Sequence, residues 1–179
     1  MNFDKKIEIV LGADTPIGIS KSMGLGLIGF ADALYEIKPD LLLILGDRYE
    51  ILAAANAALL ARIPIAHLHG GESTEGLIDE AIRHSITKMS HLHFVATETY
   101  KNRVIQLGEH PDTVFNVGGL GIDNFLKIEL LKKDKLEKEM NYKFKERNLL
   151  ITFHPVTLEN NTTQIQMNEL LEALSSFND

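Results

Sequence analysis

The sequence predicts an α/β fold, a Rossmann-like doubly wound parallel sheet. Short apolar runs of strand length alternate along the chain with stretches that have helical periodicity. The runs are continuously apolar rather than alternating, which is typical of strands buried on both faces of a parallel sheet. Several runs end directly in glycine. Strand–helix alternation of this kind builds a parallel sheet with right-handed crossovers.

The first half of the chain supplies the first predicted elements. A strand is predicted over 6–11 and a helix over 20–37, where apolar residues recur at helical spacing. A second strand over 40–45 ends at Gly46, and an alanine-rich helix follows over 49–62. Pro64 then opens a strand that ends in Gly70 and Gly71.

The next elements continue the alternation. A helix over 77–90 has acidic residues in its first turn, where the helix dipole favours carboxylates. A strand over 91–96 follows, and then a helix over 98–107 with Thr97 as its cap and Gly108 as its end. A strand over 113–117 closes at Gly118.

The composition changes after residue 125. A lysine-rich segment over 127–145 predicts a solvated helix or linker, 148–153 a buried strand and 164–177 a last helix. One strand and one helix bury too little apolar surface to form a core. We therefore predict an N-terminal Rossmann-like domain over 1–125, a linker or helix over 126–147, and the start of a second, unfinished Rossmann-like domain over 148–179.

Charge and composition exclude several classes. The 179 residues carry 18 Lys and Arg against 25 Asp and Glu, a net charge of −7, which disfavours nucleic-acid binding. The absence of cysteine excludes disulfides and thiolate metal sites. Because we find neither an apolar run of about 20 residues nor a secretory leader, we expect a cytoplasmic protein without a membrane segment.

Two patterns resemble cofactor or metal motifs. Residues 24–29 match G-x-G-x-x-G, but no strand runs directly into the first glycine, so we interpret them as a helix with small residues for close packing. Two His-x-His pairs lie on predicted strands, where alternation places both members on one face. A metal-dependent hydrolase would use such pairs, yet strands covered by helices favour core histidines, and we expect neither metal nor nicotinamide. The pairs are His67 with His69, and His91 with His93.

Acidic and basic residues gather at predicted strand ends and at one helix start. They are Asp47, Glu72, Asp79, Glu80, Arg83 and His84. Asp79 and Arg83 are four residues apart on the predicted helix and therefore share a face. Helix capping plus a salt bridge explains this set as well as catalysis does. Carboxylates beside an arginine and a histidine suit proton abstraction and return, and departure of an anionic group.

Three motifs in this order carry a resemblance to a known family: GDRYE over 46–50, HGGE over 69–72, and DEAIRHSITK over 79–88. The chain resembles the hydrolysing UDP-N-acetylglucosamine 2-epimerases of sialic acid biosynthesis, and their relatives that act on bacillosamine-type sugars. Supporting segments lie at 14–16, 22–24, 103–108, 116–118 and 154–157. The resemblance implies a glycosyltransferase-B-like two-domain fold, with the active site in the cleft between its halves.

The same resemblance implies a reaction. UDP is eliminated to leave a 2-acetamidoglucal, and water then adds with inversion at C2, giving N-acetylmannosamine and UDP. This route needs a UDP-sugar substrate but no cofactor or metal. We also expect a homo-oligomer, because an unfilled sheet edge favours self-association.

The resemblance also assigns roles to residues of this sequence. Asp47 matches a carboxylate that serves proton transfer at C2, and Glu72 one that steers hydration of the glycal. Asp79 matches the acid at the start of the helix, Arg83 the arginine one turn on, and His154 a histidine near the diphosphate. Which carboxylate removes the C2 proton stays open. Further candidates for substrate binding are Arg48, Gly71, Glu80, His84 and Gly118.

Other interpretations stay open. The resemblance implies a basic loop before this chain and a glycine- and serine-rich loop after it, so we expect a central fragment that is inactive alone. The same chemistry on UDP-N,N'-diacetylbacillosamine, or a non-hydrolysing UDP-N-acetylglucosamine 2-epimerase, are alternatives. A fragment that binds or assembles without turnover is an alternative of a different class.

Overall fold

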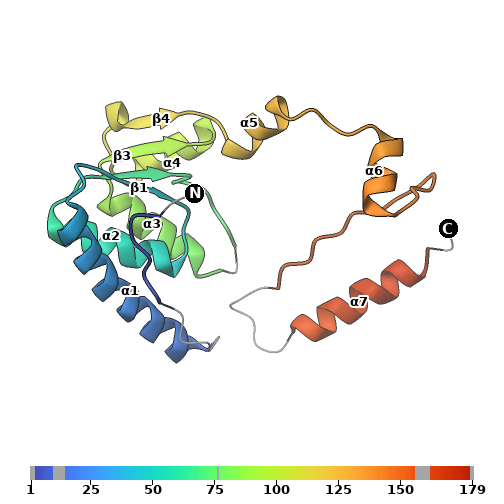
Figure 1. Ribbon diagram of the computed structural model, residues 1–179, viewed down its shortest axis with the longest axis horizontal. Coiled ribbons are helices and arrows are strands. Elements are labelled where there is room, and N and C mark those ends of the chain that lie inside the picture. The colour runs from blue at the N-terminus through green and yellow to red at the C-terminus, as the bar shows by residue number, and fades with distance from the viewer. Residues whose placement is uncertain (1–2, 10–14, 76, 156–161, 178–179) are drawn as a thin grey trace. The chain divides into compact units, whose positions relative to one another are not determined.

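A parallel sheet forms the centre of the N-terminal part of the chain (Figure 1). In the computed structural model, which describes residues 3–9, 15–75, 77–155 and 162–177, the sheet has four strands in the order β1-β2-β3-β4. They are β1 (Leu42–Leu45), β2 (Ile65–Leu68), β3 (Leu92–Val95) and β4 (Val114–Asn116). All neighbouring pairs are parallel, and His67 of β2 is in register with His93 of β3. The α/β class and the parallel sheet predicted from the sequence are confirmed.

Helices connect the strands in sequence order: α2 (Tyr49–Ala61), α3 (Asp79–Met89) and α4 (Glu98–Gln106), with α1 (Pro16–Ile37) before β1. Right-handed crossovers between successive neighbouring strands place the connecting helices along the same face of a sheet. The apolar residues on the other face of β1 are uncovered, since Leu43 is 62% and Leu45 51% exposed. The expectation of burial on both faces is therefore wrong for β1, because no described residue covers this side.

Local sequence explains where two helices begin. The Thr15 side chain accepts a hydrogen bond from the Gly18 amide at 3.1 Å, and Pro16 takes the first helical position, so α1 starts earlier than residue 20. The Thr97 hydroxyl likewise accepts from the Tyr100 amide at 3.3 Å and caps α4, as the sequence predicted.

Close packing explains two of the three glycines of the G-x-G-x-x-G pattern, Gly26 against α2 and Gly29 against Ile7. These residues lie inside α1, so the helical interpretation of the pattern is confirmed. A Cβ added to Gly26 would lie 3.3 Å from the Cβ of Ala53, and one added to Gly29 would collide with Ile7. Ala53, Ala55 and other alanines of α2 are fully buried and provide the flat surface that this approach requires.

Among the described helices, α1 has the length and composition to cross a membrane, with at most two charged residues in an 18-residue window. No such segment was expected from the sequence. The property is weak evidence for a membrane span, because core helices of soluble proteins share it. Burial of Leu34 in the core cluster that includes Ala57 and Ala58 of α2 accounts for part of the apolar composition.

Two predicted strands are not found among the residues that the structure describes. Residues 6–9 are irregular, and 10–11 lie outside the described residues. Residues 148–153 are also irregular, and Leu150 is 99% exposed. A strand needs a neighbour to pair its backbone groups, and no described residue offers one to either segment. Local apolar composition alone therefore predicted too many strands.

The chain divides into two units, Met1–Leu120 and Gly121–Asp179. Three helices lie in the described residues after β4: α5 (Leu120–Lys127), α6 (Lys133–Met140) and α7 (Thr163–Ser175). Within the second unit, the rings of Tyr142 and Phe144 meet edge to face at 5.3 Å, and Glu137 accepts the Phe144 amide at 2.9 Å. The predicted last helix is confirmed, whereas a second Rossmann-like domain starting at 148 stays a prediction.

Candidate functional site

Polar side chains gather where β1 and β2 end. Residues 46–48 follow β1 and residues 69–74 follow β2, and the carboxyl ends of parallel strands meet at one edge of the sheet. Gly46 has a φ of +91°, a left-handed conformation that lets the chain turn sharply out of β1. The first turn of α3 lies after the second loop, so one strand edge and one helix start build the site.

Arg83 of α3 joins the two loops. Its guanidinium Nη2 donates to Asp47 Oδ2 and, at 3.1 Å, to Thr74 Oγ1, while Nη1 donates to the Glu72 carbonyl oxygen at 2.8 Å. The Arg83 side chain is only 4% exposed, whereas that of Asp47 is 25% exposed. A buried guanidinium is tolerated only where carboxylate and carbonyl oxygens compensate its charge. Arg83 therefore fixes Asp47 at the surface of the site.

Glu72 is oriented by a histidine that precedes it in the same loop. Its Oε1 lies 2.8 Å from Nδ1 of His69, and the Glu72 side chain is 31% exposed. His69 has a φ of +63°, an uncommon conformation for a residue other than glycine. Its amide donates to the Phe94 carbonyl of β3 at 2.9 Å. The turn at His69 thus directs the Glu72 carboxylate toward solvent with one oxygen already engaged.

Glu80, in the first turn of α3, binds the middle of the loop. Its Oε2 accepts hydrogen bonds from the Thr74 amide at 2.7 Å and from the Ser73 hydroxyl at 2.9 Å. The hydrogen bond from the Thr74 amide is the main reason why the pKa of Glu80 is lowered. Nε2 of His84 lies 3.7 Å from Glu80 Oε1, and burial lowers the pKa of His84. Glu80 therefore faces the loop as an ionised acceptor.

Gly71 lets the loop rest against α4. Its φ is +79°, and a Cβ there would collide with the carbonyl oxygen of Tyr100 and lie 2.8 Å from a methyl of Val104. The Gly71 carbonyl in turn accepts a hydrogen bond from Arg103. Contacts to α4 therefore hold the start of the loop, and contacts to α3 hold its end.

The ion pair of Arg83 differs from the one its helix position suggests. Spacing along α3 favours Asp79 as the partner, but the guanidinium pairs with Asp47, because the fold places the end of β1 beside α3. Asp79 lies close enough to Arg48 to raise its pKa slightly, although Glu50 is the main cause. Arg48 itself is exposed and pairs with Glu50 at 3.1 Å.

The remaining predicted residues lie elsewhere. Gly118, with a φ of +82°, follows β4 at the same edge of the sheet as the site. His154 lies in the second unit and is exposed. Sequence reasoning considered His69 only as a possible metal ligand and as part of the HGGE motif, and it gave no role to Thr74. For His69 the available signal was its position three residues before Glu72.

The other strand histidines belong to the core. Nε2–H of the fully buried His67 donates to the Gly46 carbonyl at 2.9 Å, and Nδ1 lies 3.3 Å from the Thr87 hydroxyl. His93, also fully buried, places Nε2 3.2 Å from Glu109. Within the described ranges, no three His, Asp or Glu side chains are grouped to hold a metal ion. The interpretation as core histidines is confirmed for His67 and His93. It is wrong for His69, which is partly exposed, and for His91, which is exposed.

We expect the protein to lose stability in acid because of His67. Burial lowers its pKa to about 4, whereas the unfolded chain takes up the proton near pH 6.5. The unfolded state binds more protons below pH 6.5, so the free energy of unfolding falls from there to about pH 4, by roughly 3 kcal/mol for this residue. Urea unfolding at pH 7 and pH 4.5 measures the loss.

The His67→Gln variant should show a smaller fall over the same range. His110→Gln is the matched control, because that side chain is 73% exposed and its replacement should leave the pH dependence unchanged. Equal pH dependence in wild type and His67→Gln would contradict the assignment.

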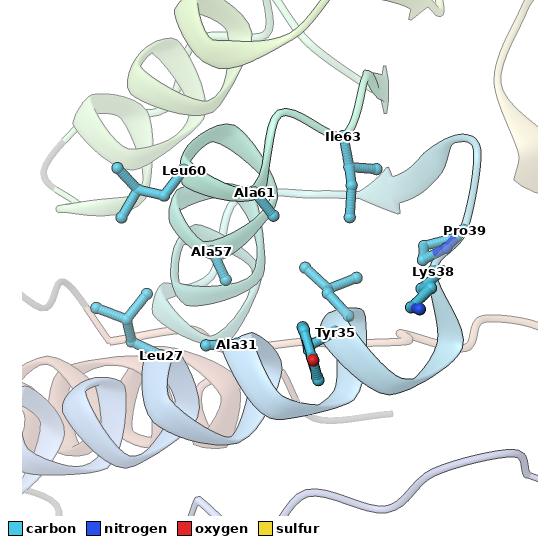
Figure 2. Close-up of a pocket in the computed structure, with 10 residues that line it drawn as sticks. Leu27, Ala31, Tyr35, Lys38, Pro39, Ala57, Leu60, Ala61 and Ile63 are labelled. Atoms are coloured by element: carbon cyan, nitrogen blue, oxygen red, sulfur yellow. The ribbon is translucent and has the colours of Figure 1, made fainter.

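An apolar cavity of about 610 Å³ lies between α1 and α2, lined by Leu27, Tyr35, Leu60 and Ile63 among others (Figure 2). It lies near the turns that lead into β1 and β2, at the amino ends of these strands. None of the candidate site residues lines it, so the polar cluster at the carboxyl ends is the stronger candidate for chemistry.

Comparisons with known proteins identify what the chain is similar to. The family model of UDP-N-acetylglucosamine 2-epimerase matches residues 1–179. GDP/UDP-N,N'-diacetylbacillosamine 2-epimerase (hydrolyzing) of Campylobacter jejuni is 48% identical over 97% of this chain and 45% of its own length. Polysialic acid biosynthesis protein P7 of Escherichia coli is 45% identical over 98% of this chain and 45% of its own length. The chain thus spans about half the length of these relatives.

A solved structure supports the same grouping. The UDP-GlcNAc 2-epimerase from Neisseria meningitidis bound to UDP-GlcNAc superposes with a TM-score of 0.60 at 27% identity, over 73% of this chain and 37% of that one. The Rossmann-like sheet is therefore part of a glycosyltransferase-B-like fold, as the sequence predicted.

Proposed function

Because the chain belongs to the UDP-N-acetylglucosamine 2-epimerase family, we propose that it carries the acid–base part of a hydrolysing UDP-sugar 2-epimerase. The observation that supports this most directly is the placement of Asp47 and Glu72. Both carboxylates are partly exposed at the carboxyl edge of the sheet, and both are fixed by Arg83, directly or through the loop backbone.

The proposed reaction has two steps. A base removes the proton at C2 of the sugar while the C1–O bond breaks, and UDP leaves with the electron pair of that bond. This forms a 2-acetamidoglucal with a C1–C2 double bond. Water then supplies a hydroxyl to C1 and a proton returns to the opposite face of C2, so that UDP-N-acetylglucosamine and water yield N-acetylmannosamine and UDP.

The two carboxylates suit the two proton transfers. Asp47 is held by Arg83 from one side, which leaves its other oxygen, Oδ1, for a substrate. In the same way Glu72 has Oε1 engaged by His69, and Oε2 remains for the substrate or the attacking water. Positioned carboxylates of this kind contribute general acid–base catalysis of roughly 10²–10⁴-fold. On the family resemblance we propose that Asp47 serves proton transfer at C2 and that Glu72 serves the hydration step.

The hydrolysing reaction and its substrate class are supported by names of relatives. The C. jejuni relative is named hydrolyzing, and it matches 97% of this chain. Its name also makes UDP-N,N'-diacetylbacillosamine a second candidate substrate. We propose a UDP-linked 2-acetamido sugar as the substrate class, with UDP-N-acetylglucosamine as the first candidate. The role would then be in nonulosonic acid synthesis, consistent with the name of the E. coli relative.

A hybrid protein tests this function. This chain replaces the aligned segment of the C. jejuni relative, and the hybrid is compared with the chain alone on both UDP-sugars. We expect the hybrid to release UDP and one equivalent of free 2-epimer, with one deuterium at C2 when the reaction runs in D₂O. The deuterium arises because the proton lost at C2 is replaced from solvent.

The outcomes separate the alternatives. A product that keeps its UDP indicates the non-hydrolysing reaction. Release of UDP by the chain alone would exclude a fragment that only binds or assembles. A hybrid that folds but acts on neither sugar, while the C. jejuni parent is active, contradicts the proposal.

A further inference from the structure

The loop over 72–74 is held from two sides by one helix. Arg83 donates to the Glu72 carbonyl and to the Thr74 hydroxyl, and Glu80 accepts from the Thr74 amide and the Ser73 hydroxyl. Arg83 and Glu80 lie one turn apart on α3. The arginine binds acceptor oxygens of the loop, and the glutamate binds donor groups of the same loop. The backbone of Glu72 is fixed between them.

The Glu80 carboxylate makes its hydrogen bonds to the 72–74 loop. Both loop donors meet the same oxygen, Oε2, and the other oxygen faces His84 at 3.7 Å. Hydrogen bonds to an ionised acceptor are about twice as strong as those between neutral groups. No other described side chain accepts from the Thr74 amide. Loss of the Glu80 carboxylate would leave this amide to water.

We propose that Glu80 is a positioning residue, which holds the 72–74 loop so that the Glu72 carboxylate and the Arg83–Asp47 pair keep their places in the site. The sequence suggested that Glu80 contacts the substrate. The geometry points instead to an action through Thr74 and Glu72. This inference rests on the proposed function for its effect on turnover, but the effect on the loop is independent of any activity.

The first part of the test measures the loop in the chain itself. Hydrogen exchange of the Thr74 amide is followed by NMR in wild type, Glu80→Gln and Glu80→Ala. We expect exchange at least ~10-fold faster in Glu80→Ala, because the amide opens to solvent when its partner is removed. Glu80→Gln keeps a neutral acceptor and should fall between the two. Glu36→Ala is the matched control, an exposed glutamate on α1 that pairs with Lys5.

The second part measures kcat and KM in the hybrid protein with the C. jejuni relative. In Glu80→Ala the displaced Glu72 should lower kcat by ~10–100-fold. KM should stay within about threefold of the wild-type value. Glu80→Gln should recover most of the lost kcat. Glu36→Ala should match wild type in both measurements.

Three results would overturn the inference: unchanged Thr74 exchange in Glu80→Ala, kcat within twofold of wild type, or a rise in KM without a change in exchange. If Glu80→Ala does not fold, unchanged Thr74 exchange in Glu80→Gln overturns it in the same way. An inactive wild-type hybrid with the expected exchange pattern would count against the proposed function and leave the loop contact established.

Discussion

Replacement of Asp47 by asparagine is expected to lower turnover of UDP-sugar by the hybrid at least ~100-fold. The variant removes a carboxylate that can exchange a proton, but it keeps an oxygen that can accept from Arg83. The buried guanidinium therefore retains a partner, and the fold should survive. UDP binding, measured by calorimetry, should stay within about threefold of wild type, because Asp47 is proposed to act at the sugar rather than at the nucleotide.

The control for this variant is Asp32→Asn, an exposed aspartate on α1, which should leave turnover unchanged. Thermal unfolding of both variants shows whether any loss of activity follows from loss of structure. Near-normal turnover by Asp47→Asn would show that Asp47 is not the group that handles the C2 proton. Glu72 would then be the next carboxylate to replace.

Replacement of Gly71 by alanine is expected to destabilise the protein by about 2–5 kcal/mol. A residue with a side chain loses about 1–2 kcal/mol in the left-handed conformation, and Gly71 has a φ of +79°. Overpacking adds about 1–3 kcal/mol, because the new Cβ would collide with the Tyr100 carbonyl and a Val104 methyl. Urea unfolding of the chain measures the difference.

Gly24→Ala is the matched control for this prediction. Gly24 lies inside α1, and a Cβ there meets no atom within 4 Å. Alanine in a helix interior should stabilise by about 0.5–1 kcal/mol. If Gly71→Ala has a free energy of unfolding as high as that of Gly24→Ala, the packing of the 69–74 loop on α4 that the structure shows is contradicted.

The sequence predicted those strands that short apolar runs mark locally. The strands from β1 to β4 lie inside the predicted ranges, because short apolar runs next to glycine are typical of buried strands. The same pattern at 148–153 gave no strand. Pairing depends on a neighbouring strand, which local composition does not reveal. The early start of α1 depends on the Thr15 cap and on Pro16 at the first helical position, whereas apolar spacing alone predicts a start at residue 20.

Part of the polar cluster could be predicted from the sequence, but its contacts could not. Asp47 and Glu72 follow strand ends, and topology alone places them at one edge. The pairing of Arg83 with Asp47 joins residues 36 apart, and nothing in the spacing of either segment indicates it. The left-handed turn at His69 is likewise a property of the folded loop. Spacing within α3 instead favoured Asp79 as the partner of Arg83. Sequence patterns indicate neighbours on one helix, but not neighbours that the fold brings together from different elements.

The two groups that hold the 72–74 loop, Glu80 and Arg83, share one helix, and this limits how the gene can change. An α-helix turns by about 100° and rises about 1.5 Å for each residue. A single codon inserted or deleted between positions 80 and 83 would leave α3 helical but rotate one of the two groups away from the loop. The stretch between Thr74 and α3 can vary in length more easily than the 69–74 loop, since an added residue there neither rotates the helix nor shifts the residues that the helix holds. Length variation among homologues is therefore expected between Thr74 and Asp79 and not within the first turn of α3.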